Sequence, residues 1–342
     1  MGNLHCVVLA SLLVGCSSSA VNPDGGITPP PGLPSGTTGD GRALAEGTGA
    51  TTPRSAGSAP ADNVAFTGGF TAGTPGTVSF TLGGAARSVE LYLPATLPTN
   101  PPLIITFHGT GGGSFDLLDD GLVAGAEDAG IILVGPQALM RNGGMGETGD
   151  PDHYPGSDGW GTSWNLGDKN RDTNNDIQFV RAIIQSARTT FNIDTDRVYV
   201  MGFSNGAFFS YFVAAMLPDR IAAFSENAGG AIRCMNRGLP GEQFKGTATT
   251  CGGLAMQTGF PTCMEELKPL PVPARIPLGY LAHGIDDDAV SVAWSCTLGT
   301  ALGNRAWVFL QAPPTGGSFG HDITTDYSAR SLAFFARYRR QD

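Results

Sequence analysis

The chain has 342 residues, of which 41% are hydrophobic and 15% charged, and its formal net charge is −10. The 20 Lys and Arg residues are scattered along the sequence, so the chain lacks the clustered positive charge that a nucleic-acid partner requires. No apolar run reaches the roughly 18 residues of a membrane-spanning helix, which argues against a protein with several spans. This length allows one large domain or two small ones.

The first 16 residues resemble a bacterial lipoprotein signal. A short apolar stretch over residues 7–14 runs into Gly15 and Cys16, and three serines follow. Small residues before a cysteine permit cleavage, and the Cys16 thiol would then carry the lipid anchor. We therefore expect a signal peptide over 1–16 and a mature protein outside the cytoplasm, held at a membrane surface only through its N-terminal lipid or secreted. An ordinary secretory signal with an incidental cysteine is the alternative.

Residues 17–62 differ in composition from the rest of the chain. Gly, Pro, Ser and Thr dominate this segment, and it contains no aromatic residue. Such a composition cannot bury enough apolar surface to offset the entropy lost on ordering the chain. We expect a disordered tether over 17–62, followed by one catalytic domain over 63–342.

The folded part begins at about residue 65, where short apolar or alternating runs appear. These runs predict strands over 78–82, 89–93, 103–107, 131–134, 198–201, 278–282 and 307–310. Helical patterns follow over 176–191, 205–217 and 327–338. Two opening hairpin-like strands and then alternating strands and helices predict an α/β fold, with a mostly parallel sheet covered on both faces. Function in such folds sits in loops at the carboxyl ends of the strands.

The predicted strand over 103–107 ends in a glycine-rich loop, residues 108–113 (His-Gly-Thr-Gly-Gly-Gly). Acyl transfer requires two backbone N–H groups aimed at the tetrahedral oxyanion, and we assign them to Thr110 and Asn205. His108 is expected to brace the loop rather than to transfer protons. No Lys-Ser or Lys-Thr follows the glycines, which argues against a phosphate-binding loop.

The next strand runs into residues 202–206 (Gly-Phe-Ser-Asn-Gly), which lead directly into a predicted helix. A serine on a tight turn between strand and helix needs glycine two residues to either side, because a larger side chain would collide with the neighbouring elements. The turn exposes the hydroxyl at the sheet edge. We predict that Ser204 is a nucleophile; a structural Gly-Ser turn is the alternative.

A serine nucleophile on this fold requires an acid and then a histidine further along the chain. His321 lies in a loop after the strand over 307–310 and before the final helix, where the base is expected. The acid would come from Asp286, Asp287 or Asp288, which follow His283 at the end of another predicted strand. A carboxylate there would orient the imidazole and stabilise its protonated form. The residues alone leave the three aspartates open.

Taken together, these motifs resemble the α/β-hydrolase esterase family of polyhydroxybutyrate depolymerases and feruloyl or acetylxylan esterases (carbohydrate esterase family 1-like). The resemblance covers roughly residues 76–340. It implies Ser204 as nucleophile and His321 as base, and its H-G-x-x-D-x-x-V motif over 283–290 places the acid on Asp287. It implies no cofactor.

Two tryptophans, Trp160 and Trp164, lie in a stretch that resembles one placed near the cleft in this family. Either could stack on an aryl or sugar ring of the substrate, and core packing is the alternative. Asp176 is expected to cap the helix that it opens. The acidic stretch over 168–176 lacks the spacing of a calcium loop, so no metal is expected.

Residues 231–275 depart from the family pattern, and we expect a cysteine-containing insert there, pinned over the active site. Four cysteines remain after the signal, and an oxidising compartment would allow two disulfides among them in three connectivities: Cys234, Cys251, Cys263 and Cys296. A zinc site is disfavoured because the cysteines lack C-x-x-C spacing and nearby histidines.

The sequence thus predicts a surface-anchored or secreted serine carboxylesterase that works through an acyl-enzyme, with a polyester or a plant cell-wall polysaccharide ester as substrate. Two other classes stay open. One is a peptidase or acyltransferase on the same fold, and the other is a catalytically silent lipoprotein that binds a polymer.

Overall fold

The computed structural model describes most of the chain beyond its first 65 residues: residues 66, 70–118, 120–139, 162–166, 168, 170–230, 251, 276–287, 289–313, 315, 317–318 and 320–340. The predicted signal peptide with Cys16 and the predicted tether lie outside these residues. Most of the predicted insert over 231–275 also lies outside them, and Cys251 is the exception.

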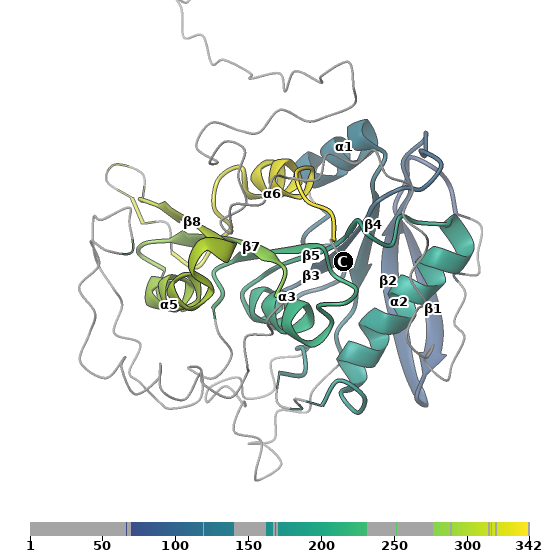
Figure 1. The fold of residues 1–342 in the computed structure, drawn as a ribbon, viewed down its shortest axis with the longest axis horizontal. Helices are drawn as coiled ribbons and strands as arrows, with labels where there is room; N and C mark the ends of the chain where they lie inside the picture. Colours follow the sequence, from purple (N-terminus) through teal and green to yellow (C-terminus); the bar gives the residue numbers. More distant parts are fainter. Residues whose placement is uncertain are drawn as a thin grey trace, which may run out of the picture.

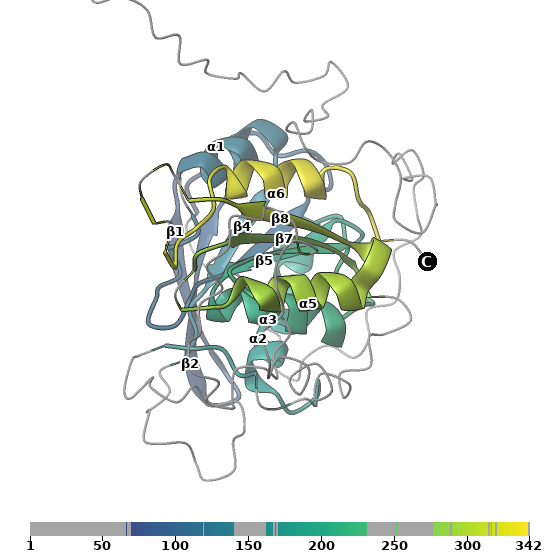
Figure 2. The ribbon, with the colours of Figure 1, turned by 90° about the vertical axis from the view of Figure 1, so that its left-hand side faces the viewer.

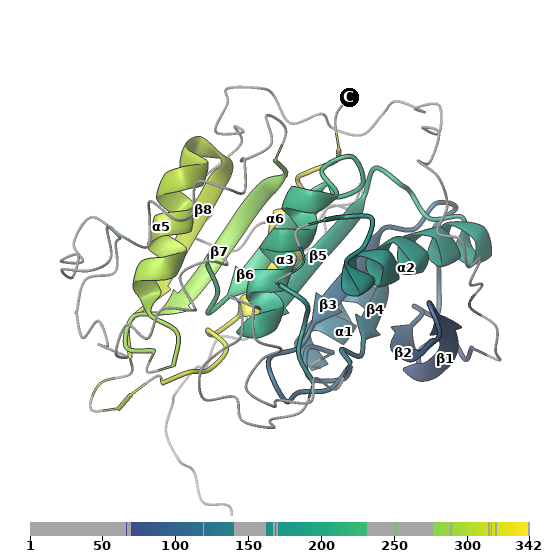
Figure 3. The same ribbon diagram turned by 90° about the horizontal axis from the view of Figure 1, so that it is seen from below.

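One eight-stranded sheet runs through the described part of the chain in the order β1-β2-β4-β3-β5-β6-β7-β8 (Figures 1 and 3). The hairpin of β1 and β2 pairs antiparallel with β4, and every later pairing is parallel. The mostly parallel sheet is therefore confirmed. Its strands are β1 (Gly76–Leu82), β2 (Ala85–Tyr92), β3 (Leu103–Phe107), β4 (Ile132–Pro136), β5 (Val198–Phe203), β6 (Ala223–Asn227), β7 (Leu278–Gly284) and β8 (Ala306–Gln311).

Helices cover both faces of this sheet, as predicted (Figure 2). Helices α1 and α6 contact each other on one face and bury one apolar cluster, whereas α2, α3 and α5 bury a larger cluster against the other face. None of the helices in the described residues has both the length and the hydropathy needed to cross a membrane. The helices are α1 (Asp120–Ala129), α2 (Asn175–Phe191), α3 (Asn205–Met216), α5 (Val292–Leu302) and α6 (Tyr327–Phe335), and a 3-10 turn (Gly303–Arg305) follows α5.

The start of α2 corrects one prediction, because Asp176 does not cap this helix. The side chain of Asn174 is the cap, and its Oδ1 accepts from the N–H groups of Asp176 at 2.9 Å and Ile177 at 3.0 Å. Asp176 lies two residues further along, in the first turn of the helix, where it is fully buried and pairs with Arg87 Nη2 of β2 at 2.7 Å. The guanidinium of Arg87 also lies 3.9 Å from the centre of the Phe179 ring. Asp176 therefore ties α2 to the sheet.

Candidate active site

Ser204 occupies the sharp turn between β5 and α3. Its backbone has φ 54° and ψ −122°, a conformation that L-residues rarely adopt. Glycine is required on both sides, because a Cβ on Gly206 would collide with the carbonyl oxygen of Phe107 and one on Gly202 with that of Gly206. The turn holds the Ser204 side chain at the carboxyl edge of the parallel sheet, as the sequence predicted.

The hydroxyl of Ser204 meets an imidazole and a carboxylate from distant parts of the chain. Its Oγ lies 2.9 Å from His321 Nε2, and His321 Nδ1 lies 2.8 Å from Asp287 Oδ2. His321 is in the loop between β8 and α6, and Asp287 directly follows β7. The Phe203 ring lies 4.8 Å from the imidazole, centre to centre. In this arrangement His321 can take the Ser204 proton while Asp287 stabilises the imidazolium.

Asp287 is the aspartate that contacts His321, as the family motif implied. Its Oδ1 also accepts from the N–H groups of Ala289 at 2.9 Å and Val290 at 2.8 Å. Burial alone would raise the pKa of Asp287, but hydrogen bonds from His283 and His321 outweigh it and hold this pKa well below its usual range. Asp286 instead accepts from Ser318 Oγ at 2.8 Å, and Asp288 lies outside the described residues.

His108 braces the glycine-rich loop that begins with it. The N–H of Ala138 donates to His108 Nε2 at 3.1 Å, so the ring proton is on Nδ1 and donates to the Gly109 carbonyl at 2.7 Å. The side chain is buried, and burial lowers its pKa, which keeps the ring neutral. These contacts support the structural role predicted for His108 over proton transfer.

The loop that carries Thr110 lies against the nucleophile. A Cβ on Gly109 would be 3.2 Å from the Cβ of Ser204, and Thr162 fixes the far side of the loop by accepting from Gly111 N–H at 2.8 Å. The N–H of Asn205 belongs to the first residue of α3 and therefore has no partner inside the helix. That Thr110 and Asn205 bind an oxyanion stays a prediction.

Trp164 is a core residue, which corrects its assignment to substrate binding. Its side chain is 2% exposed and stacks on the Phe209 ring at 4.9 Å between centres. Its indole N–H donates to the His108 carbonyl at 2.9 Å, and its backbone N–H donates to Asn205 Oδ1 at 2.8 Å. Trp164 thus joins the glycine-rich loop to the turn of Ser204. Trp160 lies outside the described residues.

Three polar side chains behind Asp287 were not assigned from the sequence. His283 is the second-last residue of β7, Ser295 lies on α5 and Glu226 lies in β6, and all three are fully buried. Glu226 could have been noticed in the sequence, because it is a glutamate inside a five-residue strand that is buried along its whole length.

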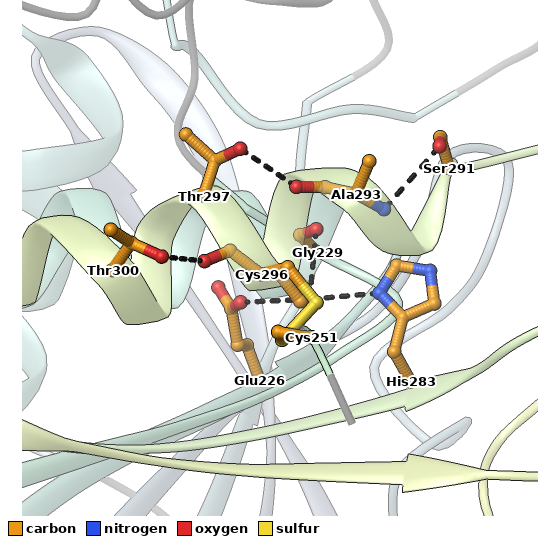
Figure 4. Close-up of a disulfide and its surroundings, with 10 residues drawn as sticks. Glu226, Gly229, Cys251, His283, Ser291, Ala293, Cys296, Thr297 and Thr300 are labelled. Atoms are coloured by element: carbon orange, nitrogen blue, oxygen red, sulfur yellow. Dashed lines mark hydrogen bonds between the residues drawn. A yellow bond between two sulfur atoms is a disulfide. The ribbon is translucent and has the colours of Figure 1, made fainter. Parts of the chain in front are cut away.

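One disulfide joins Cys251 to Cys296 of α5, with the two Cα atoms 5.4 Å apart (Figure 4). This selects one of the predicted pairings, and it connects residue 251 of the predicted insert to a helix packed on the sheet. Cys234 and Cys263 lie outside the described residues. Among the side chains that the structure describes, no group of three His, Cys, Asp or Glu residues is placed to hold a metal ion.

Comparison with protein families and known structures finds similarities to hydrolases. A model of the prolyl oligopeptidase family matches residues 152–231, which include the turn of Ser204. The solved acetyl xylan esterase from Aspergillus awamori has a TM-score of 0.51 at 15% identity, and the match covers 73% of this chain and 94% of that chain. The predicted α/β-hydrolase fold is thereby confirmed.

Relatives by sequence include three proteins named for ester hydrolysis. A bifunctional acetylxylan esterase/xylanase of Neocallimastix patriciarum is 30% identical over 43% of this chain and 18% of its own length. Feruloyl esterase B of Thermothelomyces thermophilus is 26% identical over 62% of this chain and 70% of its own. Poly(3-hydroxyalkanoate) depolymerase C of Paucimonas lemoignei is 26% identical over 42% of this chain and 31% of its own length. The chain spans 18% to 51% of the length of the first three curated relatives that it matches.

Proposed function

We propose that this chain, a member of the esterase family of α/β hydrolases, is a serine carboxylesterase whose triad is Ser204, His321 and Asp287. The observation that carries the proposal is the unbroken hydrogen-bonded line from Ser204 Oγ through His321 to Asp287, with distances of 2.9 and 2.8 Å. A serine on a strained turn, next to an imidazole whose far nitrogen faces a buried carboxylate, is the arrangement of a nucleophile with its base.

The reaction proceeds in two halves. Ser204 Oγ attacks the ester carbonyl carbon while His321 Nε2 takes its proton, and the N–H groups of Thr110 and Asn205 stabilise the oxyanion. The C–O bond to the alcohol then breaks, and His321 returns the proton to the leaving oxygen. Water attacks the acyl-enzyme with His321 again as base, which releases the acid and restores the Ser204 hydroxyl. No cofactor enters this scheme.

The substrate class follows from the relatives. Their names refer to acetylxylan, feruloyl esters and poly(3-hydroxyalkanoate), and each of these is an ester of a polymer or is itself a polyester. We therefore propose a plant cell-wall polysaccharide ester or a polyester as the substrate. Release assays on acetylated xylan, feruloylated xylan and a polyhydroxybutyrate film would identify the acyl group that this site accepts.

The decisive test is Ser204→Ala, assayed on p-nitrophenyl acetate. We expect this change to lower kcat by at least about 10³-fold, because the covalent route is lost while binding groups remain. A fluorophosphonate probe should label the wild type and fail to label the variant. Ser79→Ala, on the exposed side of β1, is the matched control and should retain both properties. Undiminished hydrolysis by the Ser204 variant would refute the assignment.

A peptidase is the second candidate, because the family model that matches residues 152–231 describes prolyl oligopeptidases. That match covers β5, α3 and the turn between them, which ester and amide hydrolases of this fold have in common. An amide and an ester of the same acyl group would separate the two activities. Cleavage of the amide at a comparable kcat/KM would favour the peptidase.

We also propose that the mature protein acts outside the cytoplasm, held by a lipid on Cys16. Support comes from the sequence of the first 16 residues and from the four cysteines beyond them, which are enough for two disulfides. The mass of the mature N-terminal peptide would identify a lipid on Cys16, and Cys16→Ser should abolish it.

A further inference from the structure

A row of buried polar side chains continues the line of the triad away from Ser204. Beyond Asp287 come His283 of β7, Ser295 of α5 and Glu226 of β6, each with 0% exposure. In Figure 4 the side chains of Glu226 and His283 approach the same point of α5 from two neighbouring strands. Buried polar groups of this kind must satisfy one another, so each proton in the row can be assigned.

The first assignment concerns the ring of His283. Its Nε2 lies 2.9 Å from the Val290 carbonyl oxygen and 3.3 Å from Asp287 Oδ2. Both partners can only accept, so Nε2 carries a proton and donates. The other nitrogen, Nδ1, lies 2.8 Å from Ser295 Oγ.

The second assignment concerns the single proton of Ser295. Its Oγ lies 2.8 Å from His283 Nδ1, 3.2 Å from the Gly229 carbonyl and 3.4 Å from Glu226 Oε1. In a neutral imidazole Nδ1 is an acceptor, so the Ser295 proton points to this nearest partner. Glu226 Oε1 then contacts an oxygen that has no proton left to give. A protonated Glu226 would complete the row by donating to Ser295 Oγ, whereas an ionised Glu226 would accept the Ser295 proton.

The surroundings of Glu226 favour this neutral form. Within the described residues, Tyr211 of α3 and Tyr327 of α6 interact electrostatically with Glu226, and neither carries a positive charge. His283 of β7 is connected to Glu226 through Ser295. Burial raises the pKa of Glu226 to about 8, and the N–H of Gly230 opposes this shift to a smaller extent. The carboxyl group is therefore largely protonated at neutral pH.

We propose that protonated Glu226, acting through Ser295 and His283, positions the Asp287 carboxylate for His321. The inference rests on the proposed function, because it assigns three positioning residues to the same triad. The proton on Glu226 directs the Ser295 hydroxyl to His283, and this contact fixes the ring so that its Nε2–H faces Asp287. Ionisation of Glu226 would draw the Ser295 proton toward the new carboxylate, and His283 would lose its donor.

The test compares variants of this row with a matched control on α5. Ser295→Ala breaks the row, and Thr297→Val removes a buried hydroxyl of the same helix that donates to the Ala293 carbonyl at 2.8 Å. We measure kcat and KM for p-nitrophenyl acetate, together with the rate of fluorophosphonate labelling. Ser295→Ala should lower kcat and the labelling rate by about tenfold with KM unchanged, because the triad is displaced but the binding groups are not. Thr297→Val should behave as the wild type.

Two substitutions of Glu226 add a pH profile. In the wild type kcat should fall as the pH rises through about 8, where Glu226 loses its proton. Glu226→Gln keeps a donor to Ser295, so it should lack this fall and retain several-fold more kcat than Glu226→Leu at pH 7. If circular dichroism shows that Glu226→Leu fails to fold, the activity of Ser295→Ala and the pH profile of Glu226→Gln still test the positioning role.

The two proposals can fail separately. If the wild type hydrolyses the ester and is labelled, but Ser295→Ala matches Thr297→Val at every pH, the row is structural only and the esterase assignment stands. A rise in KM at constant kcat would also overturn the inference. If the wild type neither hydrolyses any ester nor takes the label, the proposed function fails and the inference fails with it.

Discussion

At the scale of single residues, Asp287 shows how a carboxylate is kept ionised in a buried site. Its side chain is 1% exposed, yet the N–H groups of Ala289 and Val290 and two imidazoles surround its oxygens. These donors offset the cost of removing the charge from water. The aspartate therefore has a structural task in its own loop besides its proposed task in catalysis.

Replacing Asp287 by Asn separates these two tasks. The amide keeps the shape of the side chain, but only its oxygen can accept a hydrogen bond. Where the amide NH2 group faces His321 Nδ1, it donates to that nitrogen, and the His321 tautomer protonated on Nε2 is favoured. We expect kcat for p-nitrophenyl acetate to fall by about 10³–10⁴-fold with little change in KM. A loss of less than tenfold would contradict the role of Asp287 as the acid.

The same variant makes a prediction about stability and pH. The pKa of Asp287 is lowered on folding, so its charge stabilises the native state above the unfolded pKa, and this contribution is lost as the pH falls toward the folded pKa. The Tm of the wild type should exceed that of Asp287→Asn at pH 6, and the gap should narrow as the pH falls below about 4. Thermal unfolding of the two proteins at pH 6 and below about pH 4 measures this difference in Tm. A constant gap would show that the ionised form is not favoured on folding.

At the scale of elements, the turn between β5 and α3 depends on contact between backbones. Gly206 packs directly on the end of β3, where the carbonyl of Phe107 leaves no room for a Cβ. Gly206→Ala should therefore shift α3 and Ser204, with a loss of activity of at least about 100-fold and a destabilisation of a few kcal/mol. Measuring kcat gives the loss of activity, and urea unfolding gives the destabilisation.

Gly76 offers a matched control for this substitution. It begins β1, and a Cβ built there would meet no atom within 4 Å. Gly76→Ala should leave kcat unchanged and alter the free energy of unfolding by less than about 1 kcal/mol. If the two glycine variants were equally active, the close contact of α3 with β3 would not be what holds Ser204.

The elements differ in how well the sequence predicts them. Strand β3 is buried at every position and reads as an uninterrupted apolar run, so its bounds were predicted correctly. Helices α1 and α5 were missed. Helix α5 is apolar on nearly all sides and lacks the 3.6-residue alternation that identifies an amphipathic helix, and α1 begins with Asp-Gly, a pair typical of turns.

The site divides along similar lines. Ser204 was identified from a local motif at the end of a strand, and His321 from its loop between the last predicted strand and the final helix. Asp287 was singled out only by the family resemblance, because the residues alone left three aspartates open. The row through His283 and Glu226 was not, because it forms only when β6, β7 and α5 come together, and no pattern within one segment records that contact. Trp164 could not be assigned, since a buried and an exposed tryptophan have the same local sequence.

At the scale of the whole molecule, the disulfide links two regions that are far apart in sequence. Cys251 and Cys296 have a sequence separation of 45, and the loss of loop entropy in the unfolded chain stabilises the native state by about 4 kcal/mol in the chain-entropy model. We expect the double variant Cys251→Ser, Cys296→Ser to lose about 3–4 kcal/mol in denaturant unfolding. Wild type treated with a reductant should approach the same midpoint, and an unchanged midpoint would mean that the bridge adds no stability.

The proposed catalytic residues are also far apart along the chain, since Ser204 and His321 have a sequence separation of 117, and this separation affects when the proposed activity can arise. The loop of His321 follows β8, the last strand of the sheet, so the triad closes only after almost the whole polypeptide has been synthesised and the sheet has been completed. A nascent or truncated chain that ends before residue 321 lacks the proposed base and should not hydrolyse esters. Under the proposed function, the order of the strands therefore delays ester hydrolysis until the sheet is complete.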